Sequence, residues 1–159
     1  MRSRIYVQLI IYFLGIVLGM LILVEFSADL LLQEDRSKYG FDETVSSFET
    51  AVADKGWVVP AVHDLQKSMA KFGTEVNSVK VFAVCQQEYA KKILSGNEER
   101  KVSSMMPCRV SIYEKEDGGV YISMINSKRL SAGMKRNVRK VMKAAYNEME
   151  EIISGIIEE

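Results

Sequence analysis

Two cysteines are the residues in this sequence with the clearest capacity for chemistry. Cys85 ends one alternating segment and Cys108 begins another, with 22 residues between them. Each lies at the apolar parity of its segment, so two antiparallel neighbouring strands would bring the thiols together. In an oxidising compartment they would form a structural disulfide, which stabilises a fold by about 3 kcal/mol for a loop of this length. The alternative is a redox-active pair, because Arg109 places a cation beside one sulfur.

The single histidine provides a second candidate. His63 is followed by Asp64 at the end of an apolar segment. Together with Cys85 and Cys108, His63 would supply three nitrogen and sulfur ligands suited to copper or zinc. The alternative is a structural histidine held by hydrogen bonds, because the sequence has neither a CxxC motif nor a second histidine. The predicted ligand-binding or redox residues are therefore Cys85, Cys108, Arg109, His63 and Asp64, and the cofactor is left undefined.

Composition and motifs exclude several functions. The chain has 159 residues, enough for one compact domain and an appendage. Its 21 Lys and Arg balance 21 Asp and Glu, which gives no overall basic excess of the kind that indicates nucleic acid as a partner. The sequence contains no phosphate-binding glycine loop, nucleophile elbow or HExxH motif, so an ordinary hydrolase or kinase is not indicated.

The N-terminal region has the composition of a membrane span. Residues 5–24 carry no charge, and Gln8 is their one strongly polar residue. A helix of this length covers about 30 Å, the thickness of the hydrocarbon core. We predict a transmembrane helix over residues 5–25. A signal peptide is the alternative, but its apolar region is about 7–15 residues long and ends at small residues.

The positions of the charges predict how the chain is oriented. Arg2 and Arg4 place residues 1–4 in the cytoplasm, because Lys and Arg near the ends of a span stay inside. Residues 26–37 would then form a connector, and residues 38–157 an extracytoplasmic domain beside the lipid bilayer. The predicted location is the cell membrane, with a single crossing.

Periodicity predicts an α+β domain with an antiparallel sheet of about four to five strands packed by helices. Strands are expected at Trp57–Val62, Ser78–Cys85, Cys108–Glu114 and Val120–Ile125, with a further strand in the connector. Helices are expected at Glu43–Lys55 and Gln87–Leu94, with a helical turn from Asp64 or Ser68 to Gly73 and a long final helix. The sequence Asp117-Gly118 between the last two strands predicts a hairpin.

The final helix has an unusual order of charges. Lys135, Arg136 and Arg139 come early in it, whereas Glu150 and Glu151 come late. This order opposes the helix dipole by roughly 0.3–1 kcal/mol for each exposed charge. One hypothesis is antiparallel pairing of two such helices in a homodimer, and the alternative is a solvated helix that tolerates the cost.

Several short segments of the sequence together resemble the motifs of one known family. The segments are Val62-His63-Asp64-Leu65-Gln66, Val81-Phe82-Ala83-Val84-Cys85, Tyr89-Ala90 with Ile93-Leu94, Met105-Met106-Pro107-Cys108-Arg109-Val110 through Tyr113-Glu114, and Asp117-Gly118. In this order they resemble the domain of unknown function 302 family. The likeness covers about residues 36–157. It implies a fold like that of the TATA-binding protein, often dimeric, with one helix-covered sheet face and no assigned activity. The resemblance makes Cys85 and Pro107-Cys108 motif positions, whereas Gln86-Gln87 departs from the family's usual Asn-Pro.

These observations lead to one preferred function and two alternatives. The preferred one is a membrane-anchored extracytoplasmic module that binds or senses a small ligand, a metal or a thiol-bearing partner. The first alternative is a thiol-redox enzyme that uses Cys85 and Cys108. The second is a structural accessory subunit that assembles with a membrane complex.

Overall fold

The computed structural model describes residues 6, 8, 10–20 and 30–158. Residues 10–20 are helical, and large apolar side chains there, such as Ile10 and Phe13, are exposed. Within the described residues, no helix combines the length and apolar character that a membrane crossing requires. Part of the predicted span 5–25 lies outside the described residues.

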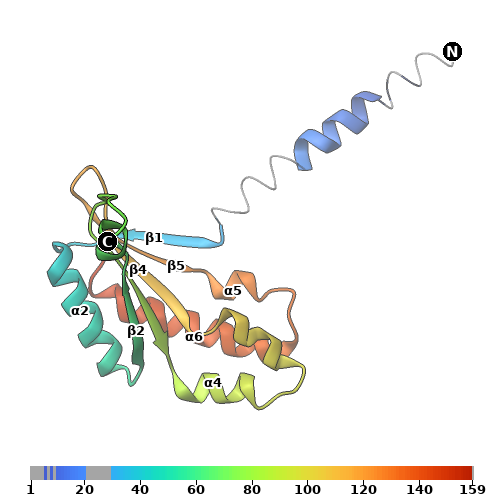
Figure 1. The fold of residues 1–159 in the computed structure, drawn as a ribbon. Coiled ribbons are helices and arrows are strands. Elements are labelled where there is room, and N and C mark those ends of the chain that lie inside the picture. Colours follow the sequence, from blue (N-terminus) through green and yellow to red (C-terminus); the bar gives the residue numbers. More distant parts are fainter. Residues whose placement is uncertain (1–5, 7, 9, 21–29, 159) are drawn as a thin grey trace.

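The domain is built on one antiparallel sheet of five strands in the order β1-β5-β4-β3-β2 (Figure 1). The strands are β1 (Leu32–Arg36), β2 (Val58–Asp64), β3 (Val79–Cys85), β4 (Cys108–Glu114) and β5 (Val120–Ile125). This confirms the predicted α+β class and strand number. Because β1 lies within residues 26–37, the expected connector supplies an edge strand, and the domain begins before residue 38.

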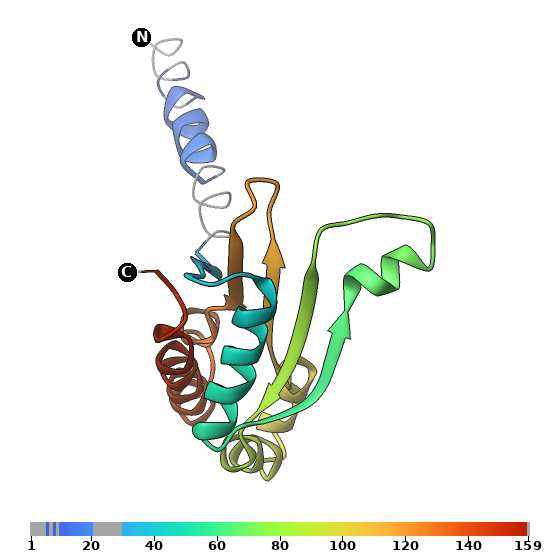
Figure 2. The same cartoon turned by 90° about the vertical axis from the view of Figure 1, so that its left-hand side faces the viewer.

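Helices cover one face of this sheet. The helices of the domain are α2 (Phe41–Asp54), α3 (Leu65–Ala70), α4 (Gln87–Leu94), the 3-10 helix η1 (Glu99–Met105), α5 (Ser127–Leu130) and α6 (Arg136–Ser154), of which α3 follows the end of β2 and has no buried residue. Figure 2 shows α2 and α6 on the same side of the strands. Alternate strand residues point toward these helices, and Phe82, Val110, Ile112 and Ile122 are almost completely buried there. The Phe48 ring of α2 meets the Phe82 ring edge to face at 5.3 Å.

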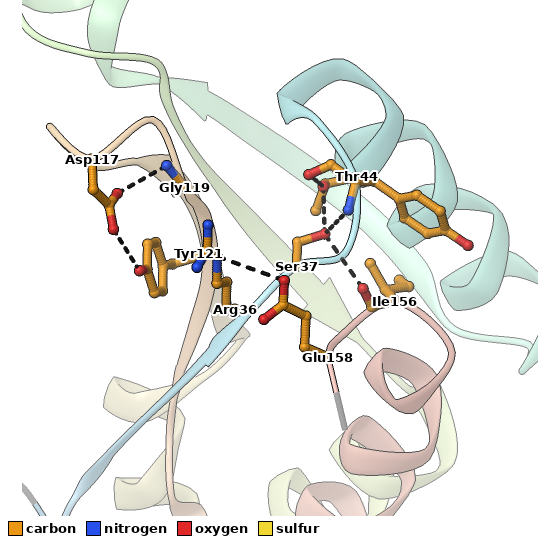
Figure 3. A network of polar contacts seen from close by, with 9 residues as sticks. Arg36, Ser37, Thr44, Asp117, Gly119, Tyr121, Ile156 and Glu158 are labelled. Carbon is orange, nitrogen blue, oxygen red and sulfur yellow. Dashed lines mark hydrogen bonds and ion pairs between the residues drawn. The ribbon is translucent and has the colours of Figure 1, made fainter.

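Polar contacts fasten β1 to both α2 and the C-terminus (Figure 3). The hydroxyl groups of Ser37 and Thr44 lie 2.7 Å apart, and Ser37 also donates to the carbonyl oxygen of Ile156 at 3.4 Å. Arg36 forms an ion pair with Glu158 at 3.7 Å. These contacts hold an edge strand that has no apolar run of its own.

The predicted hairpin joins β4 to β5. Gly118 has a φ of 74°, a left-handed conformation that favours glycine. Asp117 accepts hydrogen bonds from the backbone N–H of Gly119 at 2.8 Å and from the Tyr121 hydroxyl at 3.0 Å. These bonds lower the pKa of Asp117, the Gly119 backbone N–H being the larger cause. The turn is therefore fixed by the local chemistry of its own residues (Figure 3).

Candidate functional site

The strand register separates the two cysteines. Val84 of β3 pairs with Cys108 of β4, and Ala83 pairs with Arg109. Paired residues share a face and neighbours alternate, so Cys108 lies on the helix-covered face and Cys85 on the opposite face. The prediction that both thiols lie on one face of the sheet is wrong. In β3 the residues that face the helices are Phe82 and Val84, and Cys85 follows Val84 on the opposite face. Both cysteines are free, and the expected disulfide is absent.

The environment of Cys108 favours a neutral thiol. Burial raises the pKa of Cys108, and the nearby Cys85 raises it further. Arg109 is exposed and belongs to the other face of β4, so it does not offset this effect. Because the thiolate is the reactive form of cysteine, Cys108 is poorly suited to nucleophilic or redox chemistry at neutral pH.

The thiols give a direct test of this geometry. Protein purified from an oxidising compartment is expected to show the same intact mass with and without reductant, because the register places Cys85 and Cys108 on opposite faces of the sheet and both are free. Alkylation of Cys108 should be slow in the folded protein and fast after denaturation. A mass difference of about two daltons, as a disulfide gives on reduction, would contradict the assigned register.

His63 does not join the cysteines. It pairs with Val81, four residues from Cys85 along β3, which corresponds to about 13 Å of strand. No group of three His, Cys, Asp or Glu side chains in the described part of the chain is arranged to hold a metal ion. The three-ligand site of His63, Cys85 and Cys108 is therefore not assembled.

Asp64 has a structural role at the start of α3. Its carboxylate accepts the backbone N–H of Lys67 at 2.9 Å, and the Lys67 ammonium lies 3.1 Å away. The backbone hydrogen bond is the main cause that lowers the pKa of Asp64. This is the N-cap arrangement that begins a helix, and it confirms the helical start predicted at Asp64.

A cavity of about 310 Å³ lies where β4 begins and β5 ends. Its walls come from η1, β4, β5, α5 and α6, and we call it the methionine pocket. Six sulfur-bearing residues line it, namely Met105, Met106, Cys108, Met124, Met142 and Met149. Sequence periodicity indicates core packing for most methionines of the domain, and the pocket depends on a convergence of elements that periodicity does not reveal.

A smaller cavity of about 40 Å³ lies directly beside the methionine pocket. Met106, Pro107, Cys108, Met142 and Ala145 line both cavities and so form their common wall. The remaining lining of the smaller cavity includes Trp57, Tyr89 and Cys85. Both cysteines therefore contact this space, although they come from opposite faces of the sheet.

Glu148 of α6 accepts hydrogen bonds from two aromatic residues that line the smaller cavity. The Trp57 indole N–H donates to one carboxylate oxygen at 3.0 Å, and the Tyr89 hydroxyl donates to the other. The two aromatic rings meet edge to face with centroids 6.1 Å apart. The hydrogen bond to Glu148 is the main cause that raises the pKa of Tyr89 to about 12. Sequence reasoning missed this trio, because no local pattern distinguishes Glu148 from its acidic neighbours.

Tyr146 connects the methionine pocket to the edge of the sheet. Its ring lines the pocket, and its hydroxyl contacts Gln33 of β1, Glu150 at 3.0 Å and Asn126 at 3.3 Å. Burial is the main cause that raises the pKa of Tyr146 to about 12, so the phenol is neutral at physiological pH. This cluster holds α6 against β1 and against the residue that caps α5.

The comparisons with known proteins agree with this architecture. Residues 33–156 match the family described as domain of unknown function DUF302. The chain belongs to the DUF302 family. The fold is similar to the crystal structure of an uncharacterized conserved DUF302 protein from Bacillus stearothermophilus. The TM-score is 0.71 and the identity 17%, and the match covers 78% of this chain and 96% of that one.

A second match extends beyond the domain. An uncharacterized protein of Aquifex aeolicus (strain VF5) is 28% identical over 144 residues, covering 91% of this chain and 93% of that protein. This length exceeds the described domain 30–158, so the match reaches into the N-terminal segment. Both matched proteins are uncharacterized, so neither match assigns a reaction to this chain.

One departure from the family pattern has a local explanation in this DUF302 domain. Gln86 stands where the family resemblance implies an asparagine, and its side-chain oxygen accepts the backbone N–H of Tyr89 at 3.1 Å. Gln86 therefore caps α4 directly, as an asparagine side chain would. The helix that carries Tyr89 toward Glu148 begins at the following residue.

Proposed function

We propose that this DUF302 domain is a membrane-tethered binding module that takes a small apolar ligand in the methionine pocket. The observation that supports this function is an apolar cavity of about 310 Å³ bounded by five structural elements. Binding sites for small molecules usually measure about 300–1,000 Å³ and have mainly apolar walls. Methionine side chains are unbranched and polarizable, so they adapt to ligands of different shape.

The charge state of the pocket also favours an apolar ligand. Tyr146 and Cys108 are the titratable groups with shifted pKa values in its lining, and both are neutral near pH 7 because their pKa values are raised. Arg109 is the charged residue in the described lining, and it is exposed, so a charged ligand would find no buried partner of opposite charge there. The thiol-redox alternative receives less support, since the two sulfurs belong to opposite sheet faces.

Three observations support the membrane tether in this proposal. Residues 5–24 carry no charge and are long enough to cross the hydrocarbon core. Large apolar side chains at described positions 10–20 are exposed, as lipid-facing residues would be. The match to the Aquifex aeolicus protein extends past the domain into this segment. We place the N-terminus in the cytoplasm and the domain outside, following Arg2 and Arg4.

Leu130→Trp tests the pocket directly. Leu130 is half-buried in the pocket wall, so an indole at this position should fill part of the cavity. The neutral fluorescent probe N-phenyl-1-naphthylamine should bind the unmodified protein saturably. The variant should bind it at least about tenfold more weakly, which equals roughly 1.4 kcal/mol.

Leu94→Trp provides the matched control. Leu94 is exposed on α4 and lies outside the pocket lining, so this variant should bind the probe as the unmodified protein does. Circular dichroism checks that both variants fold. Equal probe binding by both tryptophan variants would refute the methionine pocket as the binding site.

A further inference from the structure

Positive charge is concentrated in one continuous part of the domain. Residues 126–147 contain no Asp or Glu and seven exposed bases. We call these seven residues the basic face: Lys128, Arg129, Lys135, Arg136, Arg139, Lys140 and Lys143. Acidic residues follow at once in Glu148, Glu150 and Glu151. The first turn of α6 has no acidic residue and its last turn no basic one, so the helix dipole does not explain this order.

The bases of α6 form one stripe that points away from the core. Arg136, Arg139, Lys140 and Lys143 are separated by three, one and three positions and cluster on one side of the helix. The buried stripe, which includes Val138 and Met142, occupies a different side. Among the described residues, Lys135 is the only member of the basic face with acidic partners, Glu98 and Glu99 at 3.8 and 3.9 Å. Most of this charge is therefore free to meet an external anion.

The basic face lies at the end of the domain where the N-terminal segment joins it. The backbone N–H of Asn126 donates to the carbonyl oxygen of Leu31 at 2.8 Å, and Arg129 donates to that of Leu30 at 3.1 Å. Figure 1 shows α5 beside the start of β1, with α6 beginning on that side. Leu30 is six positions after Val24, so the connecting chain can span at most about 22 Å.

We propose that the basic face docks on the anionic phospholipid headgroups of the bilayer that holds the tether. This proposal rests on the tether of the proposed function, which keeps the domain within reach of one membrane surface. Each Lys or Arg close to an anionic surface increases partitioning about fivefold. Glu25 and Asp29 of the connecting chain offset part of the charge, but the seven bases outnumber them.

Docking in this way has a consequence for the methionine pocket. Ser127 and Leu130 belong to both α5 and the pocket lining, and Leu30 and Ile125 are exposed apolar residues at the same end. The pocket is therefore brought close to the lipid surface. The ligand class that fits this placement is an apolar molecule that partitions into membranes.

The docking can be measured on residues 30–159 alone. This part contains the whole sheet and core, and the Bacillus stearothermophilus chain consists almost entirely of the matching unit. Cosedimentation is measured with phosphatidylcholine vesicles that contain or lack phosphatidylglycerol. We expect binding to the anionic vesicles at low salt, with loss of binding at high salt, because salt screens surface charge.

Two triple variants locate the binding surface. The variant Arg136→Gln/Arg139→Gln/Lys140→Gln should lower partitioning onto anionic vesicles about 100-fold, following about fivefold for each charge. The variant Lys38→Gln/Lys67→Gln/Lys71→Gln removes the same amount of charge from other positions. Lys38 follows β1, Lys67 lies in α3 and Lys71 follows α3. This control should lower partitioning only a few-fold. Circular dichroism confirms that both variants are folded.

Several outcomes would overturn the docking. These are an equal loss in both triple variants, equal binding to neutral vesicles, or absence of binding to either. Salt-sensitive dimerisation in sedimentation without vesicles, abolished by the α6 variant, would assign the basic face to a second copy instead. The tether is tested in a separate experiment on the full chain. Release of the full chain from membranes by a salt wash would refute the tether and leave the vesicle result on docking unchanged.

Discussion

Phe82→Ala is expected to lower the free energy of unfolding by about 3–5 kcal/mol, the usual range for removing a buried phenylalanine ring. Phe82 is 0% exposed in β3, and its ring meets Phe48 of α2 edge to face. The substitution removes the contact that joins helix and sheet and leaves a cavity between them. Small domains have a free energy of unfolding of about 5–15 kcal/mol, so Phe82→Ala should remove a large part of the stability of this domain.

Urea unfolding of residues 30–159, followed by circular dichroism, measures the effect of Phe82→Ala. Phe72→Ala is the matched control, because the Phe72 ring is 83% exposed. The control should change the free energy of unfolding by less than about 0.5 kcal/mol, as surface substitutions usually do. Similar losses in the two variants would contradict the assigned core.

Glu148→Ala is expected to lower the free energy of unfolding by about 2–4 kcal/mol. Its carboxylate accepts the Trp57 indole N–H and the Tyr89 hydroxyl, and bonds to a charged partner are each worth about 1.5–3 kcal/mol. Removing this acceptor leaves two partly buried donors without a partner. It also loosens the aromatic wall beside the methionine pocket, so weaker probe binding is expected with it.

Glu151→Ala is the matched control for Glu148→Ala. Glu151 lies three positions further along α6 and forms an exposed ion pair with Lys55 at 2.7 Å. Exposed pairs contribute at most about 1 kcal/mol, so the control should be nearly neutral. In a Tyr89→Phe background, Glu148→Ala should become less destabilising, because one donor is already absent. Equal effects in both backgrounds would refute the coupling between Tyr89 and Glu148.

The pKa of Tyr89 gives an independent measurement of the same bond. Ultraviolet titration should show this pKa falling from about 12 toward the ordinary value of 10.0 in Glu148→Ala. Because folding raises the pKa of Tyr89, its stabilising effect is complete below pH 10 and is lost as the pH rises through about 12. The difference in stability between the unmodified protein and Glu148→Ala should therefore shrink above pH 10.

Several elements were predictable to the residue because their signals are local. Cys108–Glu114 and Val120–Ile125 are strands with the expected bounds, and Gln87–Leu94 is a helix with the expected bounds. Alternation of apolar residues and the Asp117-Gly118 turn specify the two strands without reference to the rest of the chain. The charge order of α6 was also visible in the sequence, although its position beside the tether was not.

The edge strand β1 is an element that local sequence patterns do not specify. Its sequence Leu32-Gln33-Glu34-Asp35-Arg36 is mostly polar, so apolar alternation does not mark it. It is a strand because it pairs with β5 and because Tyr146, Thr44 and Glu158 fasten its two ends. The strand expected within the connector is therefore confirmed, and its place at the edge of the sheet comes from tertiary contacts.

The sequence by itself determined the α+β class, the family, most strands and helices, and the uncharged N-terminal segment. The tertiary structure decided which faces and which distant residues meet. A single position of register places Cys85 and Cys108 on opposite faces, and periodicity within each strand carries no information about that pairing. The methionine pocket and the Glu148 contacts likewise arise where separate elements converge, because side chains far apart in sequence become neighbours only through packing.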